Sequence, residues 1–531
     1  MHHVSADAVA AYTAMLPSVT LEQLNALDTC DLPWQRICSN WMHAQTARQM
    51  LCATVGMQHE EPVSIDLIHD GPHAIVAGTT GAGKSILLKT WCLTMALHYS
   101  PQQLQFVFMD FKGGSTFDSL MQLPHVRGCV SDLQLSHAIR ALEALEHELK
   151  RREELAAQLG RSDLNDVADV ARLVIVVDEF HALHAFLPDY IERLVRVASL
   201  GRSLAMHVIV CTQNPLGQVS SSMKANMNLR ICLRVQDALQ SQELLNSDIA
   251  ALLPAQPAGT ACSTVTQSHP FRVAYCHNDQ RLIQHITLAA RFLNIAQQPP
   301  LFTAPLPAHI PDDLFEMLLN TYQLSPDQAH AALAQSSANP IQPQISSTRS
   351  HSSSSTQPQF PELVLGIADN GVSFDLATID LTQGNVAIIG LPERGKTTTL
   401  TTLRKQCHKS SIHFVDDADA LLDPMAMSTE SQQFREQLAN PTHRTLFTVR
   451  TTRWLRVPEH AATRLIFPTG DRNTDLADGV PSSLSSLLTA EDISIPGRAV
   501  LINAGQARLV QCLGSVPVPL LRLIVPDYPH E

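Results

Sequence analysis

The segment Gly78–Ser85 (GTTGAGKS) combines residue types and a spacing that can bind the phosphates of a nucleotide. Its glycines let backbone N–H groups approach phosphate oxygens, and the lysine and hydroxyl that follow supply a positive charge and a metal ligand. We expect Lys84 to reach the β- and γ-phosphates and Ser85 to bind Mg²⁺. The sequence therefore predicts a site for ATP and Mg²⁺, formed by the loop residues Gly78, Thr79, Thr80, Gly81, Ala82, Gly83, Lys84 and Ser85.

Two later apolar runs end in polar residues that suit the same chemistry. Residues 173–177 (LVIVV) precede Asp178 and Glu179, which predicts a buried parallel strand with two carboxylates at its tip. Phosphoryl transfer needs one group to hold Mg²⁺ and another to activate water, and we assign these roles to Asp178 and Glu179 in that order. Residues 206–211 (MHVIVC) lead to Gln213, which we expect to sense the γ-phosphate.

The elements around the loop must position these groups. The apolar run at 74–77 predicts a strand before the loop, and the run that starts at Ile86 predicts a helix whose N-terminus faces the phosphates. Buried strands of this kind, with a helix directly after the loop, indicate an α/β fold.

Length and composition are those of a globular protein with two to four domains, since 45% of the 531 residues are hydrophobic. No run of apolar residues is long enough to span a membrane and the N-terminus does not resemble a signal peptide, so we expect a soluble, cytoplasmic chain. The eleven cysteines occur without a C-x-x-C pair, which favours reduced thiols over zinc ligands. A formal charge of −13 offers no overall footprint for nucleic acid.

A segment rich in Ser, Pro and Gln divides the chain. It has almost no apolar residues with which to form a core, so it predicts a flexible linker. We expect five parts: an N-terminal helical extension at 1–50, an ATPase domain with intact motifs at 51–310, a helical segment at 311–334, the linker at 335–360, and a second, degenerate P-loop domain at 361–531.

The second block repeats the first. Motifs around Gly56 recur in the same order around Gly366, and internal duplication is the simplest account. In the second loop (GLPERGKT), a proline, a glutamate and an arginine replace small residues, which stiffens the backbone and adds a negative charge beside the phosphates. Asp416 and Asp417 end a short strand, and no later strand ends in a clear sensor. We interpret this copy as a nucleotide-binding or structural pseudo-ATPase, whose candidate binding residues are Gly390, Gly395, Lys396 and Thr397.

These motifs resemble those of the FtsK/SpoIIIE-like ATPases, and among them the EccC/EssC-type motors of type VII secretion. The segments that carry the likeness are GPH at 71–73, DFKGGSTF at 110–117, VDEF at 177–180 and GRSL at 201–204. The likeness is strong over about 50–270 and weak over about 362–515. It implies two tandem RecA-like P-loop NTPase domains joined by the linker, in hexamers where an arginine of a neighbouring subunit completes each site.

By this resemblance Arg202 or Arg230 is the arginine that acts in the neighbouring site, and the sequence does not choose between them. The resemblance also implies an ATP-hydrolysing motor that exports small helical-hairpin proteins through a type VII-like system and meets its membrane subunits at the inner face of the membrane. Two alternatives stay open. One is a double-stranded DNA translocase, since FtsK and SpoIIIE pump DNA, and the other is a nucleotide-gated docking platform for secreted proteins without sustained motor activity.

Overall fold

The chain folds into two compact units, unit 1 at Met1–Thr303 and unit 2 at Ala304–Glu531. The computed structural model describes residues 6–44, 50–111, 116–130, 135–167, 169–183, 187, 189–267, 269–311, 362–407, 411–485, 488, 490–503 and 505–514. The linker expected at 335–360 and nearly all of the helical segment expected at 311–334 lie outside these residues. Leu306 and Ile310 pack with Val364 and Ile367 of unit 2, so the contacts of unit 2 begin before residue 310.

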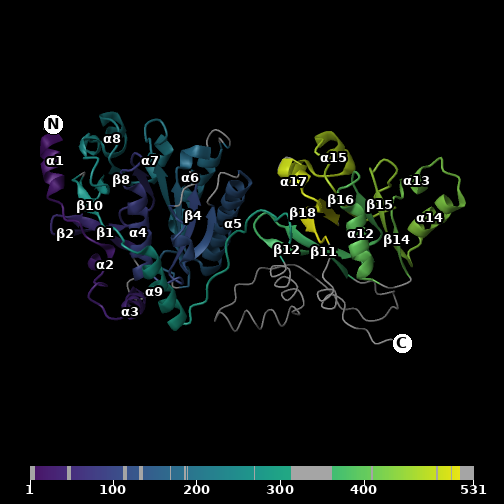
Figure 1. The fold of residues 1–531 in the computed structure, drawn as a ribbon, viewed down its shortest axis with the longest axis horizontal. Coiled ribbons are helices and arrows are strands. Elements are labelled where there is room, and N and C mark those ends of the chain that lie inside the picture. The colour runs from purple at the N-terminus through teal and green to yellow at the C-terminus, as the bar shows by residue number, and fades with distance from the viewer. Residues whose placement is uncertain are drawn as a thin grey trace. The chain divides into compact units, whose positions relative to one another are not determined.

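The sheet of unit 1, of which Figure 1 labels β1, β2, β4, β8 and β10, has a parallel half and an antiparallel half. Its strand order is β2-β1-β10-β9-β8-β3-β7-β6-β4-β5, and the strands from β8 to β5 are parallel. Strands β3, β4, β6 and β7 are buried at every position, as expected where helices cover both faces of a sheet. The bounds are β1 (Cys52–Gln58), β2 (Glu61–Asp66), β3 (Ala74–Ala77), β4 (Leu104–Asp110), β5 (Val126–Val130), β6 (Arg172–Asp178), β7 (Met206–Thr212), β8 (Leu229–Leu233), β9 (Thr260–Ser263) and β10 (Phe271–Val273).

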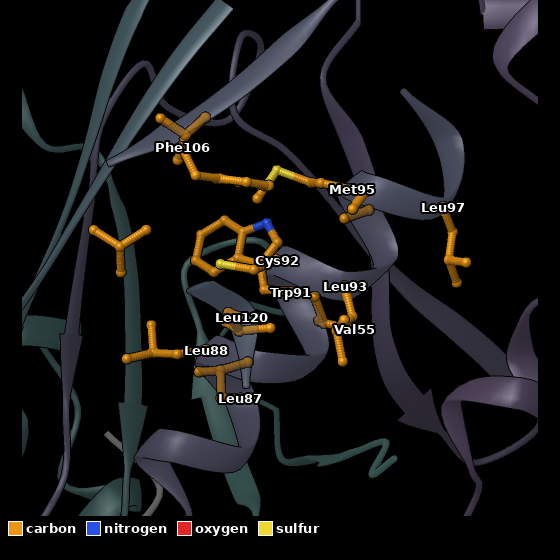
Figure 2. Packing of buried hydrophobic residues seen from close by; sticks show 14 of the residues in the cluster. Val55, Leu87, Leu88, Trp91, Cys92, Leu93, Met95, Leu97, Phe106 and Leu120 are labelled. Carbon is orange, nitrogen blue, oxygen red and sulfur yellow. The ribbon is translucent and has the colours of Figure 1, made fainter. Parts of the chain in front are cut away.

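Helices pack on both faces of this sheet. Ala74 and Val76 of β3 share one apolar cluster with the helix after the loop, and Figure 2 shows the residues that this helix contributes. From the other face, the Tyr190 hydroxyl donates to Met109 Sδ at 3.4 Å. The helices are α1 (Ala6–Ala14), α2 (Leu21–Leu24), α3 (Pro33–Ala44), α4 (Lys84–His98), α5 (Leu135–Leu159), α6 (Tyr190–Gly201), α7 (Ser221–Asn226), α8 (Ala238–Leu245) and α9 (Asp279–Phe292), with 3₁₀ turns η1 (Leu120–Gln122), η2 (Phe180–Leu183), η3 (Arg202–Leu204) and η4 (Ile249–Leu252).

The N-terminal helices are part of the core of unit 1. Trp41 of α3 is 1% exposed, and its indole N–H donates to the carbonyl of Ala96 in α4 at 3.0 Å. Ile37, one turn earlier, is fully buried in the same cluster. Because truncation of a buried Trp typically costs about 3–5 kcal/mol, helix α3 contributes substantially to the stability of unit 1.

Unit 2 repeats the strand order of unit 1 without counterparts of β4 and β5 among its described residues. The order is β12-β11-β18-β17-β16-β13-β15-β14, and β16, β13, β15 and β14 are parallel. The predicted tandem α/β fold is therefore confirmed. The bounds are β11 (Glu362–Asp369), β12 (Phe374–Asp380), β13 (Val386–Ile389), β14 (Ile412–Val415), β15 (Arg444–Val449), β16 (Thr463–Ile466), β17 (Arg498–Asn503), β18 (Gln506–Cys512), η5 (Leu381–Gln383), α12 (Lys396–Lys405), α13 (Asp419–Leu422), α14 (Thr429–Ala439), α15 (Arg472–Asp478), α16 (Ser482–Ser485) and α17 (Ala490–Ser494).

The same irregularity occurs in the antiparallel half of both sheets. The register shifts at Gly56 between β1 and β2, and at Gly366 between β11 and β12. A Cβ at Gly56 would lie 2.1 Å from the carbonyl oxygen of Arg272, and one at Gly366 would lie 2.0 Å from that of Gln511. Only glycine fits such an approach of two backbones. This shared detail supports internal duplication.

In the part of the chain that the structure describes, no helix has the length and apolar character needed to cross a bilayer.

Candidate nucleotide-binding site

The loop Gly78–Ser85 joins the end of β3 to the start of α4, as the sequence predicts. Gly81 and Gly83 have φ angles of +80° and +102°, a region that side chains disfavour. Gly83 also lacks space, because a Cβ there would lie 2.5 Å from the amide nitrogen of Gly259. The loop is thus fixed against the segment before β9, with its last residues at the N-terminus of α4, where backbone N–H groups favour an anion.

Lys84 is buried beside the two carboxylates at the end of β6, Asp178 and Glu179. Its Nζ lies 3.1 Å from Asp178 Oδ1 and 3.5 Å from Glu179 Oε2. Burial acts to lower the pKa of Lys84, but the charges of Asp178 and Glu179 outweigh it and the pKa is raised. The lysine therefore stays positively charged in a site that is only 7% exposed at this residue. The sequence separates these groups widely, and the parallel strand order brings them together.

Glu179 has an unusual backbone conformation for a residue with a side chain. Its φ angle is +55°, in the left-handed region. Such conformations cost about 1–3 kcal/mol and cluster at functional sites. The turn separates the two carboxylates, because Asp178 ends the buried strand and Glu179 already lies in the following segment. The two acids can consequently carry different roles.

Gln213 contacts the loop directly. The Thr80 hydroxyl donates to Gln213 Oε1 at 2.8 Å, and the amide of Gly78 donates to the Thr212 carbonyl at 3.2 Å. The end of β7 and the start of the loop are therefore linked by both backbone and side chain. A side chain in this position can respond to the terminal phosphate of a bound nucleotide.

The oxygen atoms beside Lys84 fit Mg²⁺. The hydroxyls of Ser85 and Thr116 are 3.3 Å apart, and the Thr116 hydroxyl donates to Asp178 Oδ2 at 3.4 Å. Mg²⁺ prefers oxygen ligands and usually takes one or two protein groups together with phosphates and water. Ser85 and Asp178 would therefore hold the metal when it enters with ATP, and Thr116 lies between them.

Thr116 and Arg234 are two residues of this site to which the sequence assigns no role. Thr116 belongs to the DFKGGSTF segment, of which residues 112–115 lie outside the described residues. Arg234 follows β8, and its carbonyl accepts hydrogen bonds from the amide of Thr79 at 2.9 Å and from the Thr79 hydroxyl at 3.1 Å.

The two candidate arginines are not brought to the chain's own carboxylates. Arg202 is exposed in η3, before β7, so it lies at the end of that strand opposite to Gln213. Arg230 is half-buried, and its guanidinium donates to the carbonyls of Met227, Leu244 and Lys224 at 3.3, 3.4 and 3.1 Å. Arg230 thus links α7 and α8, whereas the side chain of Arg202 has no such partners among the described residues.

The loop of unit 2 has a similar backbone but different side-chain contacts. Gly395 has the same φ of +102° as Gly83. The ammonium of Lys396, however, donates to the loop's own Gly390 carbonyl and to the Val449 carbonyl at 3.2 Å. Burial lowers the pKa of Lys396, although nearby acids oppose this.

The strand pairing of unit 2 gives counterparts for the candidate residues Glu179 and Gln213. Asp417 corresponds to Glu179 and shares its positive φ, at +54°. Arg450 follows β15 in unit 2 as Gln213 follows β7 in unit 1. The Nε atom of Arg450 lies 3.8 Å from Asp417 Oδ1. A cation therefore stands where unit 1 has a neutral amide.

The sequence pattern of the FtsK/SpoIIIE family matches residues 39–247, which include the whole loop, both carboxylates and Gln213. Residues 39–247 are an FtsK/SpoIIIE-family domain. This P-loop ATPase domain starts within α3, which agrees with the packing of that helix in the core.

Relatives and solved structures extend this likeness. The ESX secretion system protein EccC of Geobacillus thermodenitrificans is 35% identical over 233 residues, which cover 41% of this chain and 16% of that protein. The cytoplasmic domain of the type VII secretion ATPase EccC of Thermomonospora curvata has a TM-score of 0.69 at 20% identity, over 96% of this chain and 69% of that one. A structure of ATPases 2 and 3 of EssC from Geobacillus thermodenitrificans has a TM-score of 0.61 at 14% identity, over 88% and 97%. The chain thus spans a small part of its full-length relative.

Proposed function

We propose that the FtsK/SpoIIIE domain of unit 1 hydrolyses ATP and drives protein export through a type VII-like secretion system. The observation that carries the proposal is the convergence of Asp178 and Glu179 on Lys84 of the loop, whose Nζ lies 3.1 Å from Asp178 Oδ1 and 3.5 Å from Glu179 Oε2. ATP hydrolysis requires a cation for the transferring phosphoryl group, a metal ligand and a base, and these three residues are suited to supply them.

The proposed roles follow from position. Glu179 orients the attacking water and takes its proton, because its carboxylate is partly exposed at 16% and extends beyond the buried strand. Lys84 neutralises charge on the β- and γ-phosphates, and the loop amides orient them. Ser85 and Asp178 hold Mg²⁺, which when bound supplies further neutralisation of the phosphates. Gln213, which accepts a hydrogen bond from the Thr80 hydroxyl of the loop, senses whether the terminal phosphate is present.

The site of unit 1 would be completed by the assembly of several copies of the chain. We propose a ring, with a hexamer as the expected form, in which Arg202 or Arg230 of one subunit neutralises charge in the site of the next. An arginine in this role acts by stabilising the transition state of phosphoryl transfer. The exposure of Arg202 favours it, because its guanidinium is available to a neighbour. The motor would work at the inner face of the membrane, in contact with membrane subunits of the secretion system.

Unit 2 is proposed to be a domain that does not hydrolyse ATP. Its lysine donates to backbone carbonyls of the loop region, and its counterpart of the base, Asp417, pairs with Arg450. These contacts differ from those of unit 1, where the lysine faces the two carboxylates directly. Gly390, Gly395 and Thr397 leave nucleotide binding open, so unit 2 would act in binding or in support of unit 1.

One experiment tests the export proposal against a DNA motor. ATP turnover of the full chain is measured alone, with a secreted protein of the helical-hairpin class, and with duplex DNA, at two salt concentrations. We expect the hairpin protein, and not DNA, to change turnover, because the chain carries a net charge of −13. Turnover that DNA stimulates, with binding that weakens steeply as salt rises, would favour a DNA translocase instead. Absence of turnover under all three conditions would favour a docking platform.

A further inference from the structure

The end of β8 presents an arginine at the mouth of the loop. The amide and hydroxyl of Thr79 both donate to the Arg234 carbonyl, at 2.9 and 3.1 Å, and the amide of Val235 donates to the Ala250 carbonyl at 3.3 Å. The backbone at Arg234 is therefore fixed to the loop. Its side chain is exposed, and the guanidinium makes no hydrogen bond or ion pair with any residue that the structure describes.

The strand order places Arg234 and the carboxylates on opposite sides of the loop. Strand β3 lies between β8 and β7, and β6 lies beyond β7. The acids and Gln213 follow β6 and β7, whereas Arg234 follows β8. The terminal phosphate must lie on the side of the acids, because the metal ligand and the base act on it there.

The other end of the nucleotide is then directed toward β8. A triphosphate bound along the loop has its nucleoside at the end remote from the γ-phosphate. On that side the loop also contacts the segment before β9, where the Gly259 amide donates to the Ala82 carbonyl at 2.9 Å. By this argument the carboxylates lie at the phosphate end of a bound nucleotide and Arg234 lies at its nucleoside end.

Unit 2 differs at the corresponding position. Cys232 pairs with Ala77 in β3, and Ile466 pairs with Ile389 in β13, so Arg234 corresponds to Pro468. The unit whose lysine donates to its own loop therefore also lacks the arginine. This is the pattern expected if the arginine serves nucleotide binding and not the fold that the units share.

We propose that Arg234 is a binding residue for the nucleoside of ATP, a role that rests on the proposed function of unit 1. A guanidinium is planar and stacks on aromatic faces, and it can donate to ribose oxygens with its remaining N–H groups. A cation over an aromatic ring contributes about 0.5–2 kcal/mol, or a factor of about 2 to 30 in affinity. Arg234 thus sets affinity for the nucleotide without acting on the reacting phosphate.

Calorimetric titration of the full chain with two ligands tests this role. The chain carries Glu179→Gln, which prevents consumption of ATP, and Lys396→Ala, which restricts phosphate binding to unit 1. Mg·ATP has a nucleoside, and Mg·tripolyphosphate has the same number of phosphates without one. Arg234→Ala is compared with Arg196→Ala, a matched change at an exposed arginine of α6 that likewise has no partner among the described residues.

We expect Arg234→Ala to weaken ATP by a factor of about 2 to 30 and to leave tripolyphosphate within about twofold. Intact tripolyphosphate binding also shows that the loop is still folded. Equal weakening of both ligands would mean that Arg234 contacts phosphates, and no weakening of either would remove it from the site, so both results overturn the proposal. If the chain with an intact Arg234 binds neither ligand, the ATPase proposal itself fails.

Discussion

Glu179→Gln separates chemistry from binding at the site of unit 1. The change removes the base and keeps the size of the side chain. Lys84 retains Asp178 at 3.1 Å, so no buried lysine is left without a counter-charge. We expect turnover to fall by about 10²- to 10⁴-fold, the usual contribution of a general base. This equals about 3–5 kcal/mol of lost transition-state stabilisation. Stability should change by about 1 kcal/mol or less, because the side chain is at the edge of the site.

The assay is steady-state phosphate release, with ATP affinity and thermal unfolding measured on the same samples. Asp417→Asn is the matched control, because it alters the corresponding position of unit 2 at nearly the same φ, +54° against +55°. It should leave turnover unchanged. Substantial hydrolysis in the Glu179→Gln chain, or a large loss in the Asp417→Asn chain, would refute the assignment of catalysis to unit 1.

Three further predictions address assembly, pH and unit 2. If Arg202 or Arg230 acts in a neighbouring site, turnover per chain should rise with protein concentration; a constant value in a chain shown by sedimentation to be monomeric would contradict this. Burial lowers the pKa of His73 to about 3 and that of His207 to about 4, so the unfolded chain binds more protons below the ordinary value near 6.5. Stability should therefore fall as pH drops from 6.5 toward 4, by about 2 kcal/mol per histidine at pH 5, as measured by denaturant unfolding. Lys396→Ala should leave turnover intact and destabilise unit 2 by about 1–2 kcal/mol, because two carbonyls lose a donor; a loss of turnover would place activity in unit 2.

The sequence predicted those parts of the site that local spacing determines. The glycine and lysine positions of the loop fix a turn between a strand and a helix, and the structure has β3 and α4 at these places. The carboxylates were recognisable because they end a wholly apolar run. The sequence could not predict how close they lie to Lys84, since this distance depends on β7 lying between β3 and β6.

Contacts between distant segments could not be read from spacing. Thr79 and Arg234 are separated by 155 positions, and only the pairing of β3 with β8 brings them together. The expected end of the first domain near residue 310 was based on composition. The structure shows that Leu306 already packs with Val364 of unit 2, a contact that composition does not indicate. The choice between Arg202 and Arg230 depends on an interface with a second chain, to which the spacing of residues in the sequence gives no guide.

The comparison of the two units indicates which features the fold requires and which the chemistry requires. Both loops have a glycine with φ of +102°, and both units have an acidic residue with a positive φ just after the second strand along the sheet, after β6 in unit 1 and after β14 in unit 2. At the glycine, a Cβ in unit 1 would lie 2.5 Å from the amide nitrogen of Gly259, and one in unit 2 would lie 3.4 Å from that of Gly497. The contacts of the lysine, in contrast, differ between the two units. In unit 1 Lys84 faces two carboxylates, and in unit 2 Lys396 faces carbonyls. The backbone of the loop is therefore similar in the two units while the contacts of the lysine differ, which is the difference expected if unit 1 hydrolyses ATP and unit 2 does not.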